Sequence, residues 1–199
     1  MYKLYNGNCL EVMKEIEDNS VDMILCDLPY GVTACKWDSV IPFDKMWGQY
    51  KRIIKTSGNI VLFASQPFTS ELILSNKNWF AYNWIWKKEQ GTNFLLANKM
   101  PLKIQIINKG TRKPTSILEF KRETGLHPTQ KPVPVGLLEY LIKTYTNEGM
   151  TVLDNCMGSG STGIACMNTN RKFIGIELDE NYFNIAKNRI EECVGESNG

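Results

Sequence analysis

Residues 151–178 combine glycine and acid spacings that are typical of a turn that binds a nucleotide-like ligand. A short β-favouring run is followed by a glycine-rich turn at 158–163, an apolar helical segment and a second strand. The glycines have the G-x-G-x-x-G spacing: Gly158, Gly160 and Gly163. Glycines at such positions let backbone N–H groups approach a ligand at the N-terminus of a helix. Glu177 follows where a ribose-binding acid is expected, so the stretch predicts half of a doubly wound nucleotide-binding unit.

Asp154 bears on which ligand this turn binds, because three interpretations fit the glycines alone. The turn could hold no ligand, a dinucleotide or S-adenosylmethionine. Asp154 ends the first strand, where a pyrophosphate would lie, and its carboxylate would repel phosphate but attract a methionine ammonium group. The stretch resembles motif I of the S-adenosylmethionine-dependent methyltransferases. That resemblance implies S-adenosylmethionine as the cofactor, bound by Asp154, Gly158, Gly160, Thr162 and Glu177.

A second group of residues that could take part in a reaction is the tetrapeptide Asp27-Leu28-Pro29-Tyr30. It follows the apolar run 21–26, so it is expected at the carboxyl end of a buried strand, where open α/β sheets place their ligands. A proline-stiffened turn with an exposed aspartate is the simpler interpretation of the tetrapeptide alone.

The chemical interpretation of the tetrapeptide starts from what methylation of a planar amino group requires. The exocyclic nitrogen of adenine is conjugated with the ring, so its lone pair is a poor nucleophile. Two acceptors, one for each N–H, would draw the nitrogen toward a tetrahedral shape: the Asp27 carboxylate and the Leu28 backbone carbonyl. Pro29 would fix the turn, and the Tyr30 ring would stack on a base that has left the duplex. We predict catalysis by positioning and electrostatics, without a metal or a covalent intermediate.

The tetrapeptide resembles motif IV of the DNA amino-methyltransferases, usually written (D/N/S)-P-P-Y. The segment His127-Pro128-Thr129-Gln130-Lys131-Pro132 is similar to the H-x-T-x-K-P segment that precedes motif I in this family. Motif IV before motif I resembles the beta class, a circular permutation of the methyltransferase fold. Asp27 resembles the adenine-N6 enzymes more than the cytosine-N4 enzymes, which commonly have Ser there.

The resemblance implies further cofactor-binding residues and also shows departures. Asn8 stands where the family often has Asp beside the cofactor's adenine, although a plain turn residue fits equally well. Thr129 and Lys131 are weaker candidates for the cofactor site, and Asp27 is expected to face the cofactor as well as the acceptor. Leu28 replaces Pro, and Cys156 replaces an aromatic residue of motif I. We expect the single histidine, His127, to be structural.

Positive charge is concentrated in residues 84–131, which hold ten Lys or Arg against three acids. This distribution is typical of a polyanion partner, here double-stranded DNA, although a solvated loop is the simpler interpretation. The predicted DNA-binding residues are Lys88, Arg112, Lys113, Lys121 and Arg122. Residues 110–125 lack periodicity, and we expect them to be mobile. Because the recognition region is short, either the target sequence is short, or a second subunit of a homodimer or the loop 90–100 contributes.

Composition places the chain among single-domain globular proteins. Its 199 residues are expected to form one methyltransferase domain, 1–199, with a short basic insertion at about 88–127. Six cysteines occur without a C-x-x-C pair or a nearby histidine, so we expect no metal site and reduced thiols. With no signal-peptide pattern and no apolar run near 18 residues, we expect a cytoplasmic protein that does not interact with membranes.

Strand-like and helix-like segments alternate along the chain. The expected strands are 2–5, 21–26, 59–64, 79–86, 103–108, 151–153 and 173–178, and the expected helices are 10–16, 43–54, 67–74, 134–145 and 164–167. This alternation predicts an α/β, Rossmann-like fold with a mainly parallel sheet and helices on both faces.

The predicted function is site-specific transfer of a methyl group to the N6 of a flipped-out adenine in DNA, the activity of restriction-modification methyltransferases. Alternatives are a cytosine-N4 DNA or an RNA amino-methyltransferase, and a catalytically silent cofactor-binding subunit of a hetero-oligomer. Intact Asp27 and Tyr30 argue against the silent subunit. A nicotinamide dehydrogenase fits less well because of the position of Asp154.

Overall fold

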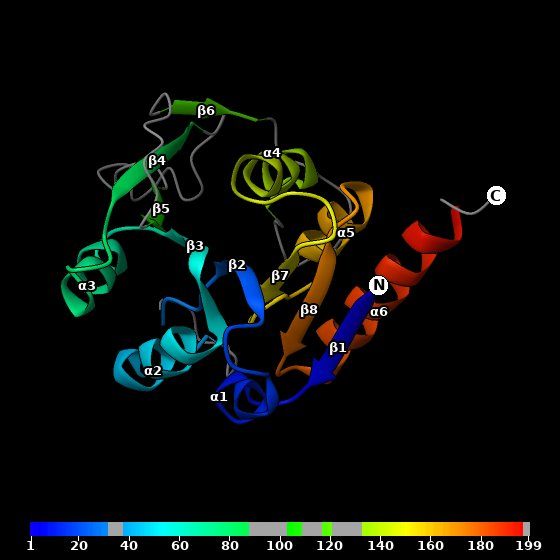
Figure 1. The fold of residues 1–199 in the computed structure, drawn as a ribbon, viewed down its shortest axis with the longest axis horizontal. Coiled ribbons are helices and arrows are strands. Elements are labelled where there is room, and N and C mark those ends of the chain that lie inside the picture. The colour runs from blue at the N-terminus through cyan, green and yellow to red at the C-terminus, as the bar shows by residue number, and fades with distance from the viewer. Residues whose placement is uncertain (32–37, 88–102, 109–116, 121–132, 197–199) are drawn as a thin grey trace, which may run out of the picture.

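The computed structural model describes residues 1–31, 38–87, 103–108, 117–120 and 133–196 (Figure 1). Within these ranges one sheet contains the strands β1 Tyr2–Asn6, β2 Val21–Asp27, β3 Ile54–Ala64, β4 Tyr82–Lys87, β5 Lys103–Asn108, β6 Ile117–Glu119, β7 Thr151–Asp154 and β8 Lys172–Glu177. The helices are α1 Cys9–Val12, the 3-10 turn η1 Met13–Glu15, α2 Phe43–Ile53, α3 Phe68–Ser75, α4 Val135–Tyr145, α5 Ser161–Asn168 and α6 Glu180–Glu196.

The sheet is mainly parallel, as its alternating sequence pattern predicts. Its strand order is β1-β8-β7-β2-β3-β5-β4-β6, and every neighbouring pair is parallel except β3–β5 and β5–β4. The strands β2 and β7 pair directly through Met23 and Val152, and β7 pairs with β8 through Asp154 and Gly175. The carboxyl ends of β2, β7 and β8 therefore lie next to one another at a single edge of the sheet.

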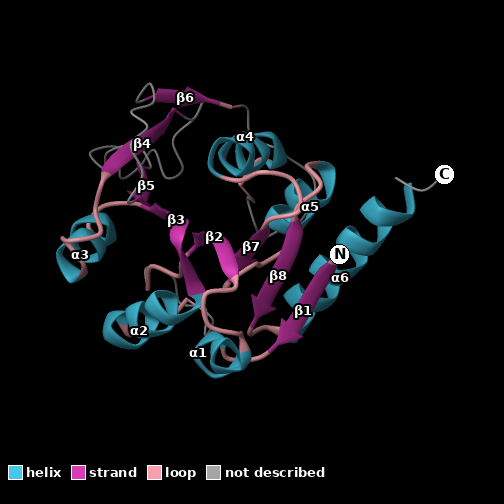
Figure 2. Cartoon of the chain, viewed as in Figure 1, coloured by secondary structure: helices cyan, strands magenta, loops and turns pink. Residues whose placement is uncertain are grey.

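Helices cover both faces of the sheet, which explains the consecutive buried apolar residues Met23–Cys26 in β2 and Ile60–Ala64 in β3 (Figure 2). Met23 and Leu25 of β2 are buried in a core with α4, α5 and α6. Ile24 and Cys26 are buried in a second core with η1, α2 and α3. Successive strand residues point to opposite faces, so a strand between two helical layers has no polar side.

The predicted elements agree with the structure in type, with differences at their ends. The predicted helix 10–16 is divided into α1 and η1, and α5 begins at Ser161, inside the segment predicted as a turn. The strand β3 begins at Ile54 rather than at residue 59, because Ile54 already pairs with Val21 before the register shifts. β4 starts at Tyr82, three residues after the predicted start.

Two elements were absent from the sequence prediction. The strand β6, Ile117–Glu119, lies within residues 110–125, for which the sequence analysis predicted no strand or helix. The helix α6 follows the last predicted strand and runs for 17 residues. No helix in the described ranges combines the length and the apolar character needed to cross a membrane.

Candidate active site

A cavity of about 500 Å³ opens at the edge where β2, β7 and β8 end. Its walls come from the Asp27-to-Tyr30 segment, the glycine turn after β7, the residues after β8, the start of α1 and residues 38–42. Both predicted chemical motifs therefore line one space, as expected for strand ends in an open α/β sheet.

Asp27 is the last residue of β2, and Tyr30 lies beside it in the cavity wall. The Tyr30 hydroxyl donates a hydrogen bond to Asp27 Oδ1 at 2.5 Å. Burial and the neighbouring Asp27 charge raise the pKa of Tyr30 well above its ordinary value, so this hydroxyl stays protonated. The Tyr30 ring lies 5.0 Å from the buried ring of Phe68, which is itself 5.7 Å from the partly buried ring of Phe43, so aromatic packing supports Tyr30.

Leu28 and Pro29 have different environments within the same segment. Leu28 is 4% exposed and packs in the core beside α2 and α3, although its residue also borders the cavity. Because the side chain of Leu28 is buried in this core, an apolar leucine is suited to the position where related motifs have proline. Pro29 borders the cavity directly.

Asp154, the last residue of β7, also lines the cavity and is buried, with 3% of its surface exposed. Its carboxylate accepts hydrogen bonds from the Thr162 hydroxyl at 2.6 Å and from the Cys156 N–H at 3.1 Å. Burial raises the pKa of Asp154 from 3.8 to about 6, although these donors partly oppose the shift. Because the Thr162 hydroxyl donates to Asp154, Thr162 orients that carboxylate in this structure.

The glycine turn is built around the second acid, Glu177. Its carboxylate accepts hydrogen bonds from the Gly158 N–H at 2.8 Å and the Asp179 N–H at 2.9 Å. Glu177 is 8% exposed, and burial raises its pKa despite these donors. Gly160 has a φ of +83°, where a side chain would be strained, and a Cβ there would lie 3.0 Å from the Ala186 Cα. Glycine is thus required here by both conformation and space.

Ser161 is a site residue that the sequence analysis did not identify. It is the first residue of α5, lines the cavity and is 6% exposed. Its Oγ has no hydrogen-bond partner among the described residues. A buried hydroxyl without a partner is unfavourable unless a ligand supplies one.

Two further residues line the cavity. Asn8 lines the cavity, and its side chain also accepts a hydrogen bond from the Leu10 N–H at 2.9 Å, which caps α1. Both interpretations of Asn8 thus fit its position. Asp38, which the sequence analysis did not single out, is 7% exposed, lines the cavity and accepts a hydrogen bond from the Gly31 N–H at 2.9 Å.

The cavity is strongly acidic. Four carboxylates line it, and the described part of its wall contains no lysine, arginine or histidine: the acids are Asp27, Asp38, Asp154 and Glu177. Such a site favours a cationic ligand and disfavours a pyrophosphate. S-adenosylmethionine carries a net positive charge through its sulfonium and ammonium groups, so the wall fits it better than a dinucleotide.

Several predicted residues lie outside the described part of the chain. They are Lys88, Arg112, Lys113, Lys121, Arg122, His127, Thr129 and Lys131. Their assignments to the DNA and to the cofactor stay predictions. Within the described ranges, no cluster of three or more His, Cys, Asp or Glu side chains has the arrangement of a metal site.

Comparison with known proteins agrees with this geometry. A family model described as DNA methylase matches residues 98–188. The chain is 30% identical to YubD of Escherichia coli (strain K12), described as a methylase, over 96% of this chain and 90% of that protein. It is 28% identical to the Type II methyltransferase M2.MboI of Moraxella bovis, over 96% of this chain and 88% of the relative.

Solved structures share the fold. The complex of M1.HpyAVI with SAM superposes with a TM-score of 0.73 at 26% identity, covering 95% of this chain and all of that chain. The PvuII DNA methyltransferase, described as cytosine-N4-specific, has a TM-score of 0.76 at 16% identity, over 98% of this chain and 90% of that chain, and shows the fold alone. The family resemblance of the motifs is confirmed, and the chain belongs to the DNA methylase family.

Proposed function

We propose that this S-adenosylmethionine-dependent DNA methyltransferase transfers the methyl group to the exocyclic N6 of an adenine that has left the duplex. The observation that carries the proposal is the shared cavity. Asp27 and Tyr30 border the same space as the glycine turn with Asp154 and Glu177. A methyl donor and an amino acceptor must meet within a few ångströms, and this cavity holds the residues suited to each.

The residues that would hold the cofactor divide into two groups. Glu177 would accept hydrogen bonds from the ribose hydroxyls, with Asn8 near the adenine. Asp154 would attract the methionine ammonium group, while Ser161, at the start of α5, would donate its free hydroxyl to the methionine carboxylate. When bound, the cofactor supplies an electrophilic methyl group.

The acceptor side depends on Asp27 and the Leu28 carbonyl. Each would accept one N–H of the target amino group, which localises the nitrogen lone pair toward the donor. Asp27 or solvent would then take the proton that the methylated nitrogen loses. Tyr30, supported by Phe68, would provide the face on which the extruded base stacks.

The Tyr30 hydroxyl and the target amino group would compete for the Asp27 carboxylate when a base enters the site. In the absence of a base it donates to Asp27, so one acceptor oxygen already has a partner. An incoming amino group competes for the same carboxylate and must displace or share with this hydroxyl. We infer that Tyr30 keeps the Asp27 carboxylate hydrogen-bonded and oriented until a base arrives.

The choice of base is tested by methylating genomic DNA with labelled cofactor and identifying the modified nucleoside. We expect N6-methyladenine. If N4-methylcytosine is the sole product, adenine is the wrong base, but the proposed roles of the site residues in methylating an amino group still stand. Sequencing the modified positions would then give the target site.

The role of Asp27 is tested separately by single-turnover transfer to a duplex that contains the identified site. Asp27→Ala should lower the rate by about 10²–10³-fold, as removal of one preorganised electrostatic group typically does. Cofactor affinity, measured by calorimetry without DNA, should stay nearly unchanged. Transfer at the wild-type rate would contradict the proposed acceptor site, and a catalytically silent subunit would show no transfer even in the wild type.

A further inference from the structure

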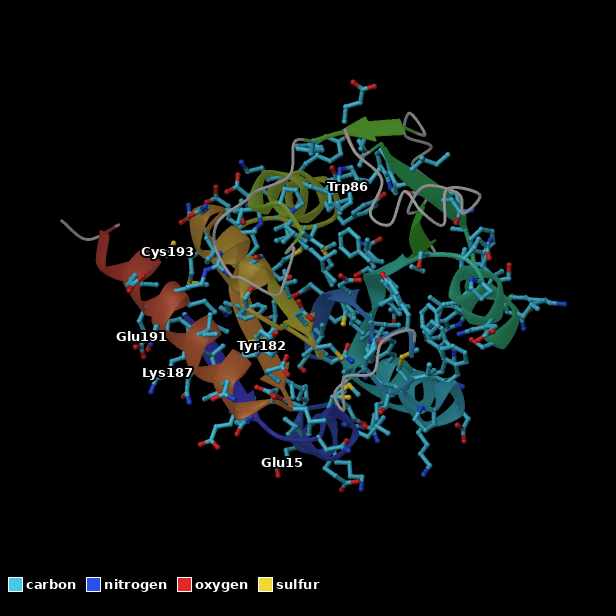
Figure 3. The ribbon with its side chains drawn as sticks, turned by 180° about the vertical axis from the view of Figure 1, so that it is seen from behind. Glu15, Trp86, Tyr182, Lys187, Glu191 and Cys193 are labelled. Atoms are coloured by element: carbon cyan, nitrogen blue, oxygen red, sulfur yellow. The ribbon has the colours of Figure 1, made fainter. Side chains whose placement is uncertain are left out.

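The helix α6 contacts the cofactor turn along one face, although none of the sequence motifs includes it. It runs from Glu180 to Glu196 beside α5 and the edge of the sheet (Figure 1). Figure 3 shows Lys187 and Glu191 on the outer side of this helix, and both are exposed. The opposite side faces the protein and contains the buried residues Ala186 and Ile190.

The contacts of this inner face fall on the glycines that form the turn. A Cβ on Gly160 would lie 2.9 Å from the Ala186 Cβ, and one on Gly163 would lie 2.4 Å from the Ile190 Cδ1. The helix therefore packs against the backbone of the turn itself. This close approach is possible only because the turn carries glycines at these two positions.

Arg189 adds a directed polar contact from the same helix. Its Nη1 donates a hydrogen bond to the Ser159 carbonyl oxygen at 2.5 Å. Ser159 is 5% exposed and lies between Gly158 and Gly160, so this carbonyl belongs to the centre of the turn. A buried carbonyl that accepts from a guanidinium is held more strongly than one that accepts from a neutral donor.

The start of α6 is attached to the same turn through Glu177. Asp179 accepts hydrogen bonds from the N–H groups of Asn181 and Tyr182, and its own N–H donates to Glu177. The second oxygen of Glu177 accepts from the Gly158 N–H. The turn is thus held by α6 at two points: through Glu177 at the beginning of the helix, and through the Arg189 contact about three turns later.

We propose that Arg189 is a positioning residue for S-adenosylmethionine, acting through the Ser159 carbonyl. It lies behind the turn and fixes the Ser159–Gly160 peptide, which sets the direction of the next residue, Ser161, into the cavity. The proposal rests on the cofactor site described above. Without the guanidinium, the turn would keep its glycines but lose the contact that orders its central peptide before the cofactor binds.

Calorimetric titration with S-adenosylmethionine, without DNA, tests this role directly. Arg189→Met keeps much of the side-chain length and removes the donors, and we expect about tenfold weaker binding. Arg189→Lys retains a cationic donor and should recover most of the affinity. Lys187→Met is the matched control, because it removes the same charge from the exposed side of the same helix and should leave the affinity unchanged.

Steady-state kinetics separate positioning from a general loss of structure. The KM for S-adenosylmethionine should rise in Arg189→Met while the kcat and the KM for DNA change little. A variant that merely folds less well would lose kcat in proportion to its active fraction, and that result would overturn the proposal. Unchanged affinity for S-adenosylmethionine in Arg189→Met would also overturn it. So would a loss of affinity in Lys187→Met equal to that in Arg189→Met. If Arg189→Met does not fold, the affinities of Arg189→Lys and Arg189→Gln for S-adenosylmethionine are compared. Wild-type affinity in both variants would contradict the positioning role. Absence of binding in the wild type would instead contradict the cofactor site.

Discussion

The buried carboxyl group of Asp154 should make cofactor affinity depend on pH in a range that is easy to measure. Burial raises its pKa from 3.8 to about 6, with hydrogen bonds from Thr162 and Cys156 opposing the shift. Between pH 5 and pH 7.5 this group therefore changes from mostly protonated to mostly ionised. If the ionised form attracts the ammonium group of the cofactor, binding must weaken as the pH falls through this range.

The size of the effect follows from the ionised fraction of Asp154. At pH 5, one unit below a pKa of about 6, roughly one tenth of the molecules hold the ionised carboxylate. The apparent Kd is the intrinsic value divided by that fraction, so it should be about tenfold higher at pH 5 than at pH 7.5. Asp154→Asn should bind S-adenosylmethionine more weakly at pH 7.5, by about 1.5–3 kcal/mol, and should lose most of the pH dependence.

The stability of the cofactor-free protein should fall as the pH rises, whereas its affinity for the cofactor should increase. A carboxyl group whose pKa is higher in the folded state binds its proton more tightly there than in the unfolded chain. The free energy of unfolding is therefore largest below about pH 4 and falls as the pH rises to about 6. The total loss from this group is on the order of 3 kcal/mol. Asp154→Asn should accordingly be more stable than the wild type at pH 7, while binding the cofactor less well.

Calorimetric titration with S-adenosylmethionine at pH 5, 6 and 7.5, paired with urea unfolding at the same pH values, measures both effects. Glu177→Gln is the control, because burial also raises the pKa of Glu177 and its titration contributes to the wild-type slope. The reasoning is refuted if Asp154→Asn keeps the wild-type dependence of the Kd on pH. It is also refuted if this variant loses stability at pH 7 without any loss of affinity.

Three other substitutions probe the acceptor side and the DNA. Tyr30→Phe should leave the single-turnover rate within a few-fold of the wild type because the ring still stacks, whereas Tyr30→Ala should lose about 1–3 kcal/mol of base binding, and equal rates in both would exclude stacking. Asp38→Ala removes the acceptor of the Gly31 N–H, next to Tyr30, and should slow methyl transfer about tenfold. Asp38→Asn should recover most of the rate because its amide oxygen can still accept this hydrogen bond. An unchanged rate in Asp38→Ala would show that the hydrogen bond does not position Tyr30. Neutralising Arg112 and Lys113 should flatten the dependence of DNA affinity on salt, and an unchanged slope would mean that neither contacts phosphate.

The parts of the site that the sequence could predict are those fixed by local pattern. Residues 23–26 of β2, with the sequence MILC, are apolar at consecutive positions because both faces of this strand are covered by helices. Such a run, followed directly by Asp27, indicates a strand end that carries a functional acid. The same holds for Asp154 after β7 and Glu177 at the end of β8. Parallel strands place these ends at one edge, so the acids could be grouped without coordinates.

The parts that could not be predicted depend on contacts between distant segments. Among the residues of α6, Ala186 and Ile190 are fully buried, which leaves a weak periodic signal for a helix of 17 residues. Ser161 is of interest because its buried hydroxyl has no hydrogen-bond partner in the described part of the chain, and this is a property of its surroundings rather than of its residue type. Asp38 likewise gains meaning only because its carboxylate accepts a hydrogen bond from the Gly31 N–H and lines the cavity.

The order of the two motifs along the chain matters less to the chemistry than the order of the strands in the sheet. Asp27 precedes Asp154 by more than half of the chain, yet β2 and β7 are hydrogen-bonded neighbours, and β8 with Glu177 follows next. The proposed mechanism requires that the strand carrying Asp27 lies beside the strand carrying Asp154, so that the acceptor and the cofactor meet. Any connection between them that preserves this adjacency keeps the three acids together at one edge of the sheet. A permuted chain can therefore keep the reaction unchanged, and its specificity can vary in the segments that join the two strands.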